Sequence, residues 1–362
     1  MKTIFSIIYA HRNRDLCRIK ASLSSLRKQR LQNFEVIFVD YGSREILVNQ
    51  LQEFLNSIPF VTFHPLPVQQ LLWNKSKALN YGIKEANGEY IFIADVDLIF
   101  HPETTKMWVG LVNPYKFYLF TLGYLNQRVT DNLSGINSFE SLNAERFGGV
   151  NGMILTSKDN LLKVNGLDEF FHFYGAEDED LFARLENAGF NRELNEVKFY
   201  YHQWHRSFSN SEDRLLSLNP RLKNIMRINQ QHFQRNRDLK VTRPIRQGEM
   251  GSFVSEERAV RLESPTLRYR IPNIYSQVEH FLREEISGLK DEVIQVTFYE
   301  DSYYNSFKHR AKKTLGIQTQ PYISLKKIND LVLKEILYNF RDCNYSYYIC
   351  RESNTIEFIL EI

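Results

Sequence analysis

Short apolar runs alternate with segments of helical period over the first hundred residues of the chain. The apolar runs predict buried strands at residues 3–9, 34–40, 61–64 and 90–94. Between these runs, apolar residues recur every three or four positions, which predicts helices at residues 15–28, 46–55 and 75–86. Regular alternation of strand and helix is typical of a mostly parallel, doubly wound sheet. We therefore expect an α/β fold.

The alternation is less regular beyond residue 98. Helical patterns follow at residues 102–108, 157–164 and 177–188, and strand patterns follow at residues 115–122, 151–155 and 198–205. The polar stretch 127–145 is predicted to be a long loop that serves as a lid. The segment Phe147-Gly148-Gly149-Val150 lets the backbone approach a neighbour closely, because glycine has no side chain.

The C-terminal third has a different texture. Prolines and charges between residues 240 and 273 predict a linker or an irregular wrap. Residues 274–362 again alternate helix and strand patterns, so we expect a small α+β accessory domain after a large domain at residues 1–239. Basic and aromatic residues from Tyr303 to Lys313 form either a solvated helix face or a surface that touches an acceptor or a membrane.

Composition narrows the class of protein. The net charge of +3 is too small to indicate nucleic acid binding. The three cysteines are odd in number and sparse, which fits free thiols in a reducing cytosol. The apolar start of the chain leads directly into a basic segment without a small-residue cleavage site, so we interpret it as the first strand and not as a signal peptide. No apolar run of about eighteen residues predicts a membrane span.

Three motifs of ionisable residues stand at the ends of predicted strands or at a helix start. They are, in chain order, Asp95-x-Asp97, Glu177-Asp178 and His202-x-x-His205. Ligands collect at the carboxyl ends of parallel strands, and two carboxylates two positions apart on an extended chain point the same way. A carboxylate with two imidazoles can complete the coordination of Mn²⁺ or Mg²⁺. A solvated turn, a charged helix start and two unrelated histidines would explain each motif alone, but their conjunction favours a metal site.

These motifs resemble those of inverting glycosyltransferases with the GT-A fold. The segments around Asp40-Tyr41-Gly42-Ser43 and Asn87-Gly88-Glu89 resemble the bacterial glycosyltransferase family two, and the finer pattern resembles the β-1,4-galactosyltransferase family. Six segments match motifs of the latter family, and they lie at residues 11–14, 73–82, 95–99, 147–150, 174–180 and 202–205. The resemblance covers residues 3–225 and does not extend to residues 240–362.

The resemblance implies a role for each matching residue. The implied donor contacts are Arg12 and Arg14 to the diphosphate, Asp40 and Lys75 to the uridine, Asp95 to the sugar and ribose, and Gly149 beside the donor. The implied metal ligands are Asp97, His205 and His202, of which His202 stands where the family has methionine. Asp178 matches the catalytic base, and Glu177 beside it would bind the acceptor or position the base. Tyr174 replaces an acceptor-stacking tryptophan, and Ala176 replaces a glycine.

The expected activity is transfer of a hexose, such as galactose or N-acetylgalactosamine, from a UDP-sugar to a glycan or lipid-linked glycan. The implied setting is the synthesis of surface polysaccharide in the cytoplasm, with the inner face of the membrane as an alternative location. Two other functions stay open. One is a sugar nucleotidylyltransferase, against which the missing glycine-rich N-terminal loop argues. The other is a non-catalytic protein that binds a nucleotide-sugar. The sequence predicts no oligomeric state.

Overall fold

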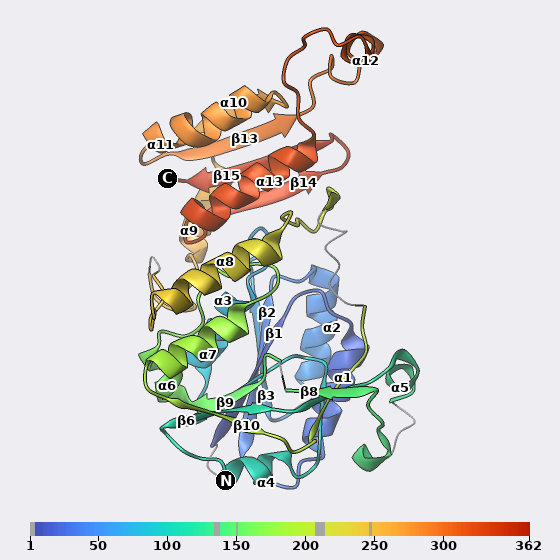
Figure 1. The fold of residues 1–362 in the computed structure, drawn as a ribbon, viewed down its shortest axis with the longest axis vertical. Helices are drawn as coiled ribbons and strands as arrows, with labels where there is room; N and C mark the ends of the chain where they lie inside the picture. The colour runs from blue at the N-terminus through green and yellow to red at the C-terminus, as the bar shows by residue number, and fades with distance from the viewer. Residues whose placement is uncertain (1–3, 134–137, 150, 207–213, 246–247) are drawn as a thin grey trace. The chain divides into compact units, whose positions relative to one another are not determined.

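The structure is a computed structural model that describes residues 4–133, 138–149, 151–206, 214–245 and 248–362 (Figure 1). The chain divides into two compact units. Unit 1 comprises Met1–Gln69, Trp73–Ser207 and Ile228–Ser252, and unit 2 comprises Gln70–Leu72, Phe208–Arg227 and Phe253–Ile362. The two units are described in turn.

Unit 1 contains a seven-stranded sheet in the order β10-β6-β9-β4-β1-β2-β3. Its strands are β1 (Phe5–His11), β2 (Phe34–Tyr41), β3 (Val61–Leu66), β4 (Tyr90–Ala94), β6 (Lys116–Phe120), β9 (Ile154–Ser157) and β10 (Asn191–Asn195). Only β9 runs antiparallel to its neighbours, and the other adjacent pairs of this sheet are parallel. The mostly parallel α/β sheet predicted from the sequence is therefore confirmed.

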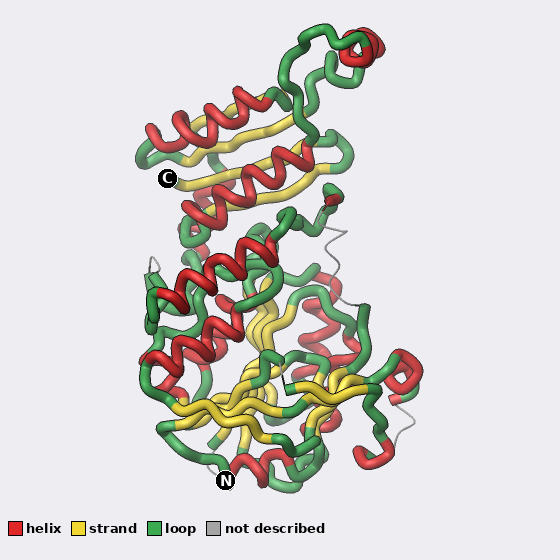
Figure 2. The backbone as a smooth tube through the Cα atoms, in the orientation of Figure 1, coloured by secondary structure: helices red, strands yellow, loops and turns green. Residues whose placement is uncertain are grey.

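Helices, drawn in red in Figure 2, connect the strands of unit 1. They are α1 (Leu16–Arg27), α2 (Glu45–Leu55), α3 (Lys75–Glu85), α4 (Thr104–Val109), α5 (Gln127–Asp131), α6 (Lys158–Lys163), α7 (Glu177–Asn187) and α8 (Ile225–Asp238). Asn74 caps α3 by accepting a hydrogen bond from the Lys77 amide. Gly82 lets α3 lie close to the sheet, because a Cβ atom there would be 2.5 Å from the Ile8 side chain.

An aromatic cluster fills the core beneath β4. The Phe92 ring lies 4.5 Å from the Trp108 ring and stacks on the Tyr200 ring at 5.6 Å. The Trp108 indole also donates a hydrogen bond to the Tyr200 hydroxyl at 2.8 Å, so the one polar atom of the indole is satisfied. Packing of this kind holds the carboxyl end of β4, where the first acidic motif begins.

A second sheet of unit 1 has the order β5-β11-β7-β8. Its strands are β5 (Leu98–Phe100), β11 (Tyr200–His202), β7 (Leu122–Tyr124) and β8 (Arg146–Gly148). Each has three residues, which is too short for a periodic signal, and for that reason β5 and β8 were not predicted. The segment predicted as a long loop contains α5 and a 3₁₀ turn at Phe139–Ser141. Residues 134–137 of that segment, and Val150 of the glycine-rich motif, lie outside the described residues.

Unit 2 contains a four-stranded sheet in the order β12-β13-β15-β14. Its strands are β12 (Leu267–Pro272), β13 (Val293–Tyr299), β14 (Tyr345–Cys350) and β15 (Thr355–Glu361), and its helical segments are α9 (Glu256–Val260), α10 (Tyr275–His280), α11 (Ile286–Gly288), α12 (Phe307–Thr314) and α13 (Leu325–Glu335). The α+β class predicted for this region is confirmed.

Among the described residues, no helix combines the length and the apolar character needed to cross a bilayer.

The predicted linker 240–273 differs from the structure at its C-terminal end. Residues 267–272 form β12, which pairs in parallel with β13 as an edge strand of the sheet. Leu267, Tyr269 and Ile271 alternate with the exposed Arg268 and Arg270. These residues alternate as they do in a strand. The arginines and the terminal proline suggested a linker instead, although proline is tolerated in an edge strand. The predicted division into a large domain at residues 1–239 and an accessory domain at residues 274–362 stays a prediction.

Candidate active site

The three predicted metal ligands lie close together. The Asp97, His202 and His205 side chains each offer a ligand atom, and these atoms all lie within 4.8 Å of one another. His202 Nε2 is 3.5 Å from Asp97 Oδ1, and His205 Nε2 is 3.5 Å from Asp97 Oδ2. The structure thus brings a carboxylate and two imidazoles from distant parts of the chain to one point.

Pairing of two short strands creates this arrangement. In the antiparallel pair of β5 and β11, His202 lies opposite Leu98, the residue after Asp97. The Gln203 amide also donates to the Asp97 carbonyl at 3.1 Å. His205 Nδ1 donates to the Arg206 carbonyl at 2.9 Å, which leaves Nε2 with its lone pair toward Asp97. The imidazole is therefore oriented for coordination by a hydrogen bond on its opposite side.

The ligand atoms of Asp97, His202 and His205 suit a divalent cation. Asp97 Oδ1 is buried and accepts no hydrogen bond within the described part of the chain. A buried carboxylate oxygen without a donor is unfavourable unless a cation or water satisfies it. Imidazole and carboxylate ligands together suit Mn²⁺ and related metals better than a purely oxygen site would. Asp97, His202 and His205 are the residues that would hold the metal.

The two aspartates of the D-x-D motif face different partners. The chain leaves β4 and turns at Val96 and Asp97 instead of staying extended. Asp95 consequently bonds to Lys75, with Lys75 Nζ 2.8 Å from Asp95 Oδ1. The extended chain assumed for this motif is wrong, because Val96 and Asp97 form a turn. The expectation that both carboxylates face one site stays a prediction.

Lys75 links the D-x-D motif to the second acidic motif. Its ammonium lies 2.8 Å from Asp95 and 3.8 Å from Glu177 Oε1. The charge of Lys75 holds the pKa of Asp95 at about 2, although burial opposes this shift. Burial raises the pKa of Glu177, and the Lys75 charge only partly offsets that effect. Lys75 thus keeps Asp95 ionised, while Glu177 favours its neutral form more than an ordinary glutamate does.

Asp178 lines a cleft beside α7. The cleft has a volume of about 320 Å³. Its lining includes Asp178 together with the aromatic rings of Phe182 and Phe233 and the guanidinium groups of Arg192 and Arg237. Arg192 lies over the Phe182 ring at 5.5 Å, and Arg237 lies over the Phe233 ring at 5.7 Å. Glu177 does not line this cleft, so only Asp178 of the two acids is presented to a molecule bound there.

Gly149 and Tyr174 stand at the margins of the site. Gly149 also lines the cleft, and a Cβ atom at this position would lie 3.3 Å from the Leu194 side chain. Tyr174 is half exposed, and burial of its hydroxyl raises its pKa. It lies in the loop immediately before α7, and the charges of Glu177 and Asp178 contribute to the raised pKa of its hydroxyl.

The basic loop after β1 is held by a buried polar network. His11 Nδ1 lies 2.6 Å from Asp40 Oδ1, and the Ser43 amide and hydroxyl donate to the same carboxylate at 2.9 and 2.5 Å. The Arg14 amide donates to His11 Nε2 at 3.0 Å. Asp40 was expected to contact the uridine, but its side chain is fully buried and bonded to protein groups. The contacts in the structure fix the loop, and the contact with the uridine stays a prediction.

The two arginines of this loop differ in their surroundings. Arg12 Nη2 donates to the Gln69 carbonyl at 2.9 Å, and its guanidinium lies 5.9 Å from the centre of the Tyr41 ring. Arg14 is exposed, and its charge contributes to the low pKa of Asp95. The charge of Arg14 thus acts on the D-x-D motif, whereas these contacts of Arg12 are with Gln69 and Tyr41.

Unusual backbone geometry precedes the acidic helix. Phe173, Gly175 and Ala176 have φ angles of 64°, 100° and 70°. Ala176 immediately precedes Glu177 and adopts the left-handed region that glycine would occupy without strain. Asn229 on α8 donates to the carbonyl groups of His172 and Tyr174 at 3.1 and 3.0 Å. This side chain holds the strained loop from which Glu177 and Asp178 project.

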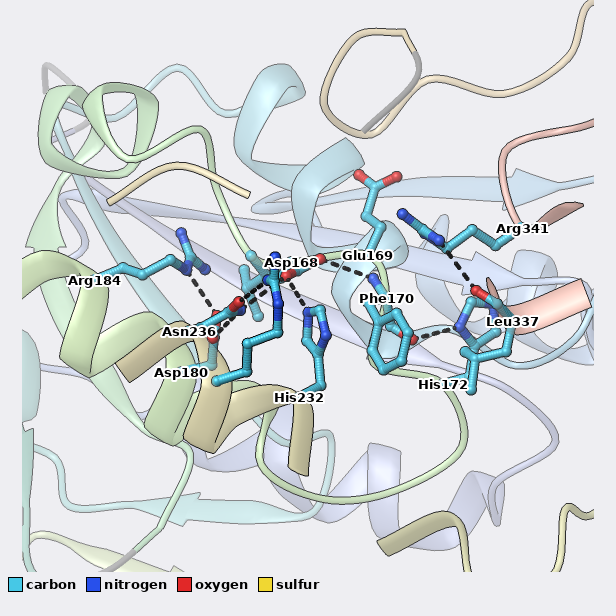
Figure 3. A network of polar contacts seen from close by, with 12 residues as sticks. Asp168, Glu169, Phe170, His172, Asp180, Arg184, His232, Asn236, Leu337 and Arg341 are labelled. Atoms are coloured by element: carbon cyan, nitrogen blue, oxygen red, sulfur yellow. Dashed lines mark hydrogen bonds and ion pairs between the residues drawn. The ribbon is translucent and has the colours of Figure 1, made fainter. Parts of the chain in front are cut away.

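A second polar network connects α7 with α8 and with Asp168 (Figure 3). Asn236 donates to Asp180 at 2.8 Å, Arg184 donates to Asp180 at 2.7 Å, and His232 Nε2 lies 2.9 Å from Asp168. Burial raises the pKa of Asp168, but the hydrogen bond and charge of His232 outweigh burial, so this pKa is about 2. These supporting residues of α8 were not predicted. The only sequence signal for them is a helical pattern in a segment without a catalytic motif.

Comparisons with known proteins add a second source of evidence. Residues 6–137 match the model of glycosyl transferase family 2, and residues 137–206 match the model of the N-terminal domain of galactosyltransferase. The predicted resemblance to glycosyltransferases is confirmed. Residues 6–206 therefore match glycosyltransferase families, and the chain has the predicted GT-A fold. The comparison with curated proteins gives no match.

Solved structures show partial similarity. Residues 1–349 of TarS from S. aureus are 21% identical to the chain, with a TM-score of 0.42, over 56% of this chain and 60% of TarS 1–349. The mannosyltransferase PcManGT from Pyrobaculum calidifontis, in complex with GDP-Man and Mn²⁺, is 16% identical, with a TM-score of 0.43, over 59% of this chain and 60% of its own. The chain thus spans about 60% of the length of these two structures.

Proposed function

We propose that the chain is a metal-dependent, inverting glycosyltransferase. It moves galactose, N-acetylgalactosamine or a similar hexose from a UDP-sugar to a hydroxyl group of a glycan or a lipid-linked glycan, in the synthesis of surface polysaccharide. One observation carries this proposal. Lys75 joins Asp95, next to the metal ligands, to Glu177, next to the acid that faces a cleft. These contacts support a site in which the proposed donor-binding groups and the proposed base lie near one lysine.

The donor would bind at the D-x-D side of the site. A divalent cation held by Asp97, His202 and His205 would neutralise charge on the leaving diphosphate. Arg12 and Arg14 would bind the phosphate oxygens, because guanidinium groups match phosphate geometry well. Asp95 would bind hydroxyl groups of the donor, and the ammonium of Lys75 would hold its carboxylate in place.

The acceptor would bind in the cleft beside Asp178. Its two aromatic rings suit the apolar faces of a sugar, and its charged side chains suit the sugar hydroxyl groups. Tyr174 would contact the acceptor from the loop before α7. A mixed lining of rings, arginines and carboxylates fits a polar glycan better than an aliphatic ligand.

In the transfer step, the Asp178 carboxylate takes the proton of the acceptor hydroxyl. The acceptor oxygen then forms a bond to the anomeric carbon of the donor. The bond from that carbon to the diphosphate oxygen breaks, and its electron pair leaves with UDP. Because this is one displacement, an α-linked donor gives a β-linked product. General-base assistance of this kind contributes about 10²–10⁴-fold to the rate.

The proposed location is the cytoplasm, with access to lipid-linked acceptors at the inner face of a membrane. Of the other two functions, a nucleotidylyltransferase would make UDP-sugar and pyrophosphate from UTP and a sugar phosphate. A non-catalytic binder would bind UDP-sugar without turnover.

The experiment that tests the proposal is a UDP-release assay with a panel of UDP-sugars, Mn²⁺ and glycan acceptors, followed by NMR of the product. We expect metal-dependent UDP release and a β-linked product. Formation of pyrophosphate would identify a nucleotidylyltransferase, and tight UDP-sugar binding without release of UDP from any donor would identify a binder. Either result would overturn the proposal.

A further inference from the structure

The helix α12 of unit 2 carries a basic surface flanked by exposed apolar residues. Lys308, Arg310, Lys312 and Lys313 lie within its eight residues. Phe307 at its start is 86% exposed, and Leu315 and Ile317 just beyond its end are 73% and 50% exposed. We call these seven residues the α12 surface. From it we infer that unit 2 binds an anionic lipid bilayer through α12, a partner surface that goes beyond the proposed transfer reaction.

The charge of the α12 surface is not compensated locally. The sequence contains no Asp or Glu from residue 302 to residue 329, and the same segment carries six Lys or Arg residues. Among the described residues, the four cations of α12 form no ion pair. Elsewhere in unit 2, the basic side chains that pair with an acid include Arg258, Arg261, Arg283 and Lys326. A cationic surface without counter-charges is complementary to anionic lipid head groups.

The exposed apolar residues distinguish a bilayer from a soluble polyanion. Burying Phe307, Leu315 and Ile317 between lipid head groups removes apolar surface from water, which is favourable. A soluble anionic polymer would neutralise the lysines but would leave these three side chains in water. The combination of cations with apolar residues at both ends of the helix therefore favours a lipid surface.

The α12 surface is held in a defined shape. Ser306 caps the helix by accepting a hydrogen bond from the His309 amide. At the other end, the Gly316 and Ile317 amides donate to the Lys313 and Lys312 carbonyls, and Gly316 has a φ angle of 69°. This is a Schellman motif, which fixes the directions of the chain around Leu315 and Ile317.

A cluster of aromatic rings connects α12 to the rest of unit 2. His309 is buried, its Nδ1 bonds to the Tyr304 carbonyl at 2.8 Å, and its ring lies 5.1 Å from the Tyr322 ring. Tyr322 in turn donates to Asp301 at 3.2 Å. Figure 1 shows α12 at the end of a long connection, away from the sheet of its own unit. The surface is thus presented on an ordered support.

Vesicle co-sedimentation with the full chain tests the inference. We expect binding to vesicles of phosphatidylglycerol and phosphatidylcholine, little binding to phosphatidylcholine alone, and release in high salt. The double variant Lys308→Glu with Lys313→Glu should lower the apparent binding constant by about thirtyfold or more. The matched variant Lys290→Glu with Lys334→Glu changes the same charge at exposed positions outside α12 and should bind like the wild type.

A second variant separates a bilayer from a polyanion. Phe307→Ser with Leu315→Ser should weaken vesicle binding but leave binding to heparin unchanged. Equal loss of binding in both charge variants, no binding of the wild type to anionic vesicles, or unchanged vesicle binding of the serine variant would each overturn the inference. UDP release with a water-soluble acceptor is the independent readout. It should be the same in all these variants, so failure of the lipid test does not bear on the proposed transfer reaction.

Discussion

His11 Nδ1 lies 2.6 Å from Asp40 Oδ1, and both side chains are fully buried. The Arg14 amide donates to the other ring nitrogen of His11, so Nδ1 carries the proton and donates to Asp40. Because the loop with Arg12 and Arg14 is tied to this pair, the buried histidine acts as a positioning residue for groups that would bind the diphosphate. The matching motif of the β-1,4-galactosyltransferase family has phenylalanine at this position.

Replacement of His11 tests this role. His11→Phe keeps a ring of similar size but leaves Asp40 without one donor and the Arg14 amide without its acceptor. We expect a loss of about 1–3 kcal/mol in the free energy of unfolding and weaker UDP binding. The control His64→Phe changes a half-buried histidine of β3 whose ring contacts Tyr81 of α3, and it should leave UDP affinity unchanged. Denaturant unfolding and calorimetry with UDP measure both quantities, and wild-type UDP affinity in His11→Phe would contradict the prediction.

The metal site makes a second prediction. Asp97→Ala and His205→Ala should each weaken Mn²⁺ binding by about tenfold to hundredfold or more, since each removes one proposed ligand. His202→Ala should have a smaller effect, because this histidine stands where the resembling family has methionine. Calorimetric titration with Mn²⁺ measures the affinities without any need for turnover. His280→Ala, at an exposed position of unit 2, is the matched control. Unchanged Mn²⁺ binding in His205→Ala would exclude this histidine as a ligand.

The assignment of the base is a third prediction. Asp178→Asn keeps the shape of the side chain but removes the proton acceptor, so turnover should fall about 10²–10⁴-fold while UDP affinity stays nearly constant. Glu196→Gln changes an exposed acid that is not part of the cleft lining and should retain most of the activity. Steady-state kinetics and UDP calorimetry provide the two readouts. If Asp178→Asn turns over at a rate similar to that of the wild type and Glu177→Gln does not, then Glu177 is the base.

The strained loop before α7 makes a fourth prediction. Ala176→Gly places glycine at a φ angle of 70°, where alanine is strained, so it should raise the free energy of unfolding by about 1 kcal/mol. Ala188→Gly is the matched control at the C-terminal end of α7, where φ is −81° and no strain is relieved. It should be neutral or should destabilise by up to about 1 kcal/mol. Destabilisation by Ala176→Gly would show that the loop conformation stores no strain at this residue.

The support of α7 predicts a pH dependence of stability. The pKa of Asp168 is about 2 in the folded chain, against about 3.9 for an unperturbed aspartate. The stability that this shift contributes is present above about pH 4 and is lost as the pH falls toward 2, because the unfolded chain binds the proton first. Asp168→Asn should therefore lower stability at pH 7 by up to about 2 kcal/mol and flatten the acid dependence.

Thermal unfolding between pH 2 and 7 checks this prediction. Asp131→Asn, at an exposed position of α5, should keep the acid dependence of the wild type. An unchanged slope in Asp168→Asn would show that this carboxylate does not couple protonation to folding.

The pattern of the sequence was sufficient for six strands of the main sheet, but the polar and largely exposed strand β10 was not predicted. Runs such as Tyr90–Ala94 are apolar at every position because both faces of the strand are covered. Short segments of the sequence were also sufficient to find the three motifs of ionisable residues. The residue types of a metal and base site are chemical requirements, and they can therefore be read without knowledge of the fold.

Tertiary structure decided how those motifs meet. The three-residue pairing of β5 with β11 sets His202 beside Asp97, although more than a hundred residues separate them in the chain. The bond between Lys75 and Asp95, which are twenty residues apart, is likewise set by the packing of α3 against the sheet. Contacts between distant residues of this kind, like the bonds from Asn236 to Asp180, leave no periodic signal, because they depend on how elements pack and not on spacing along the chain.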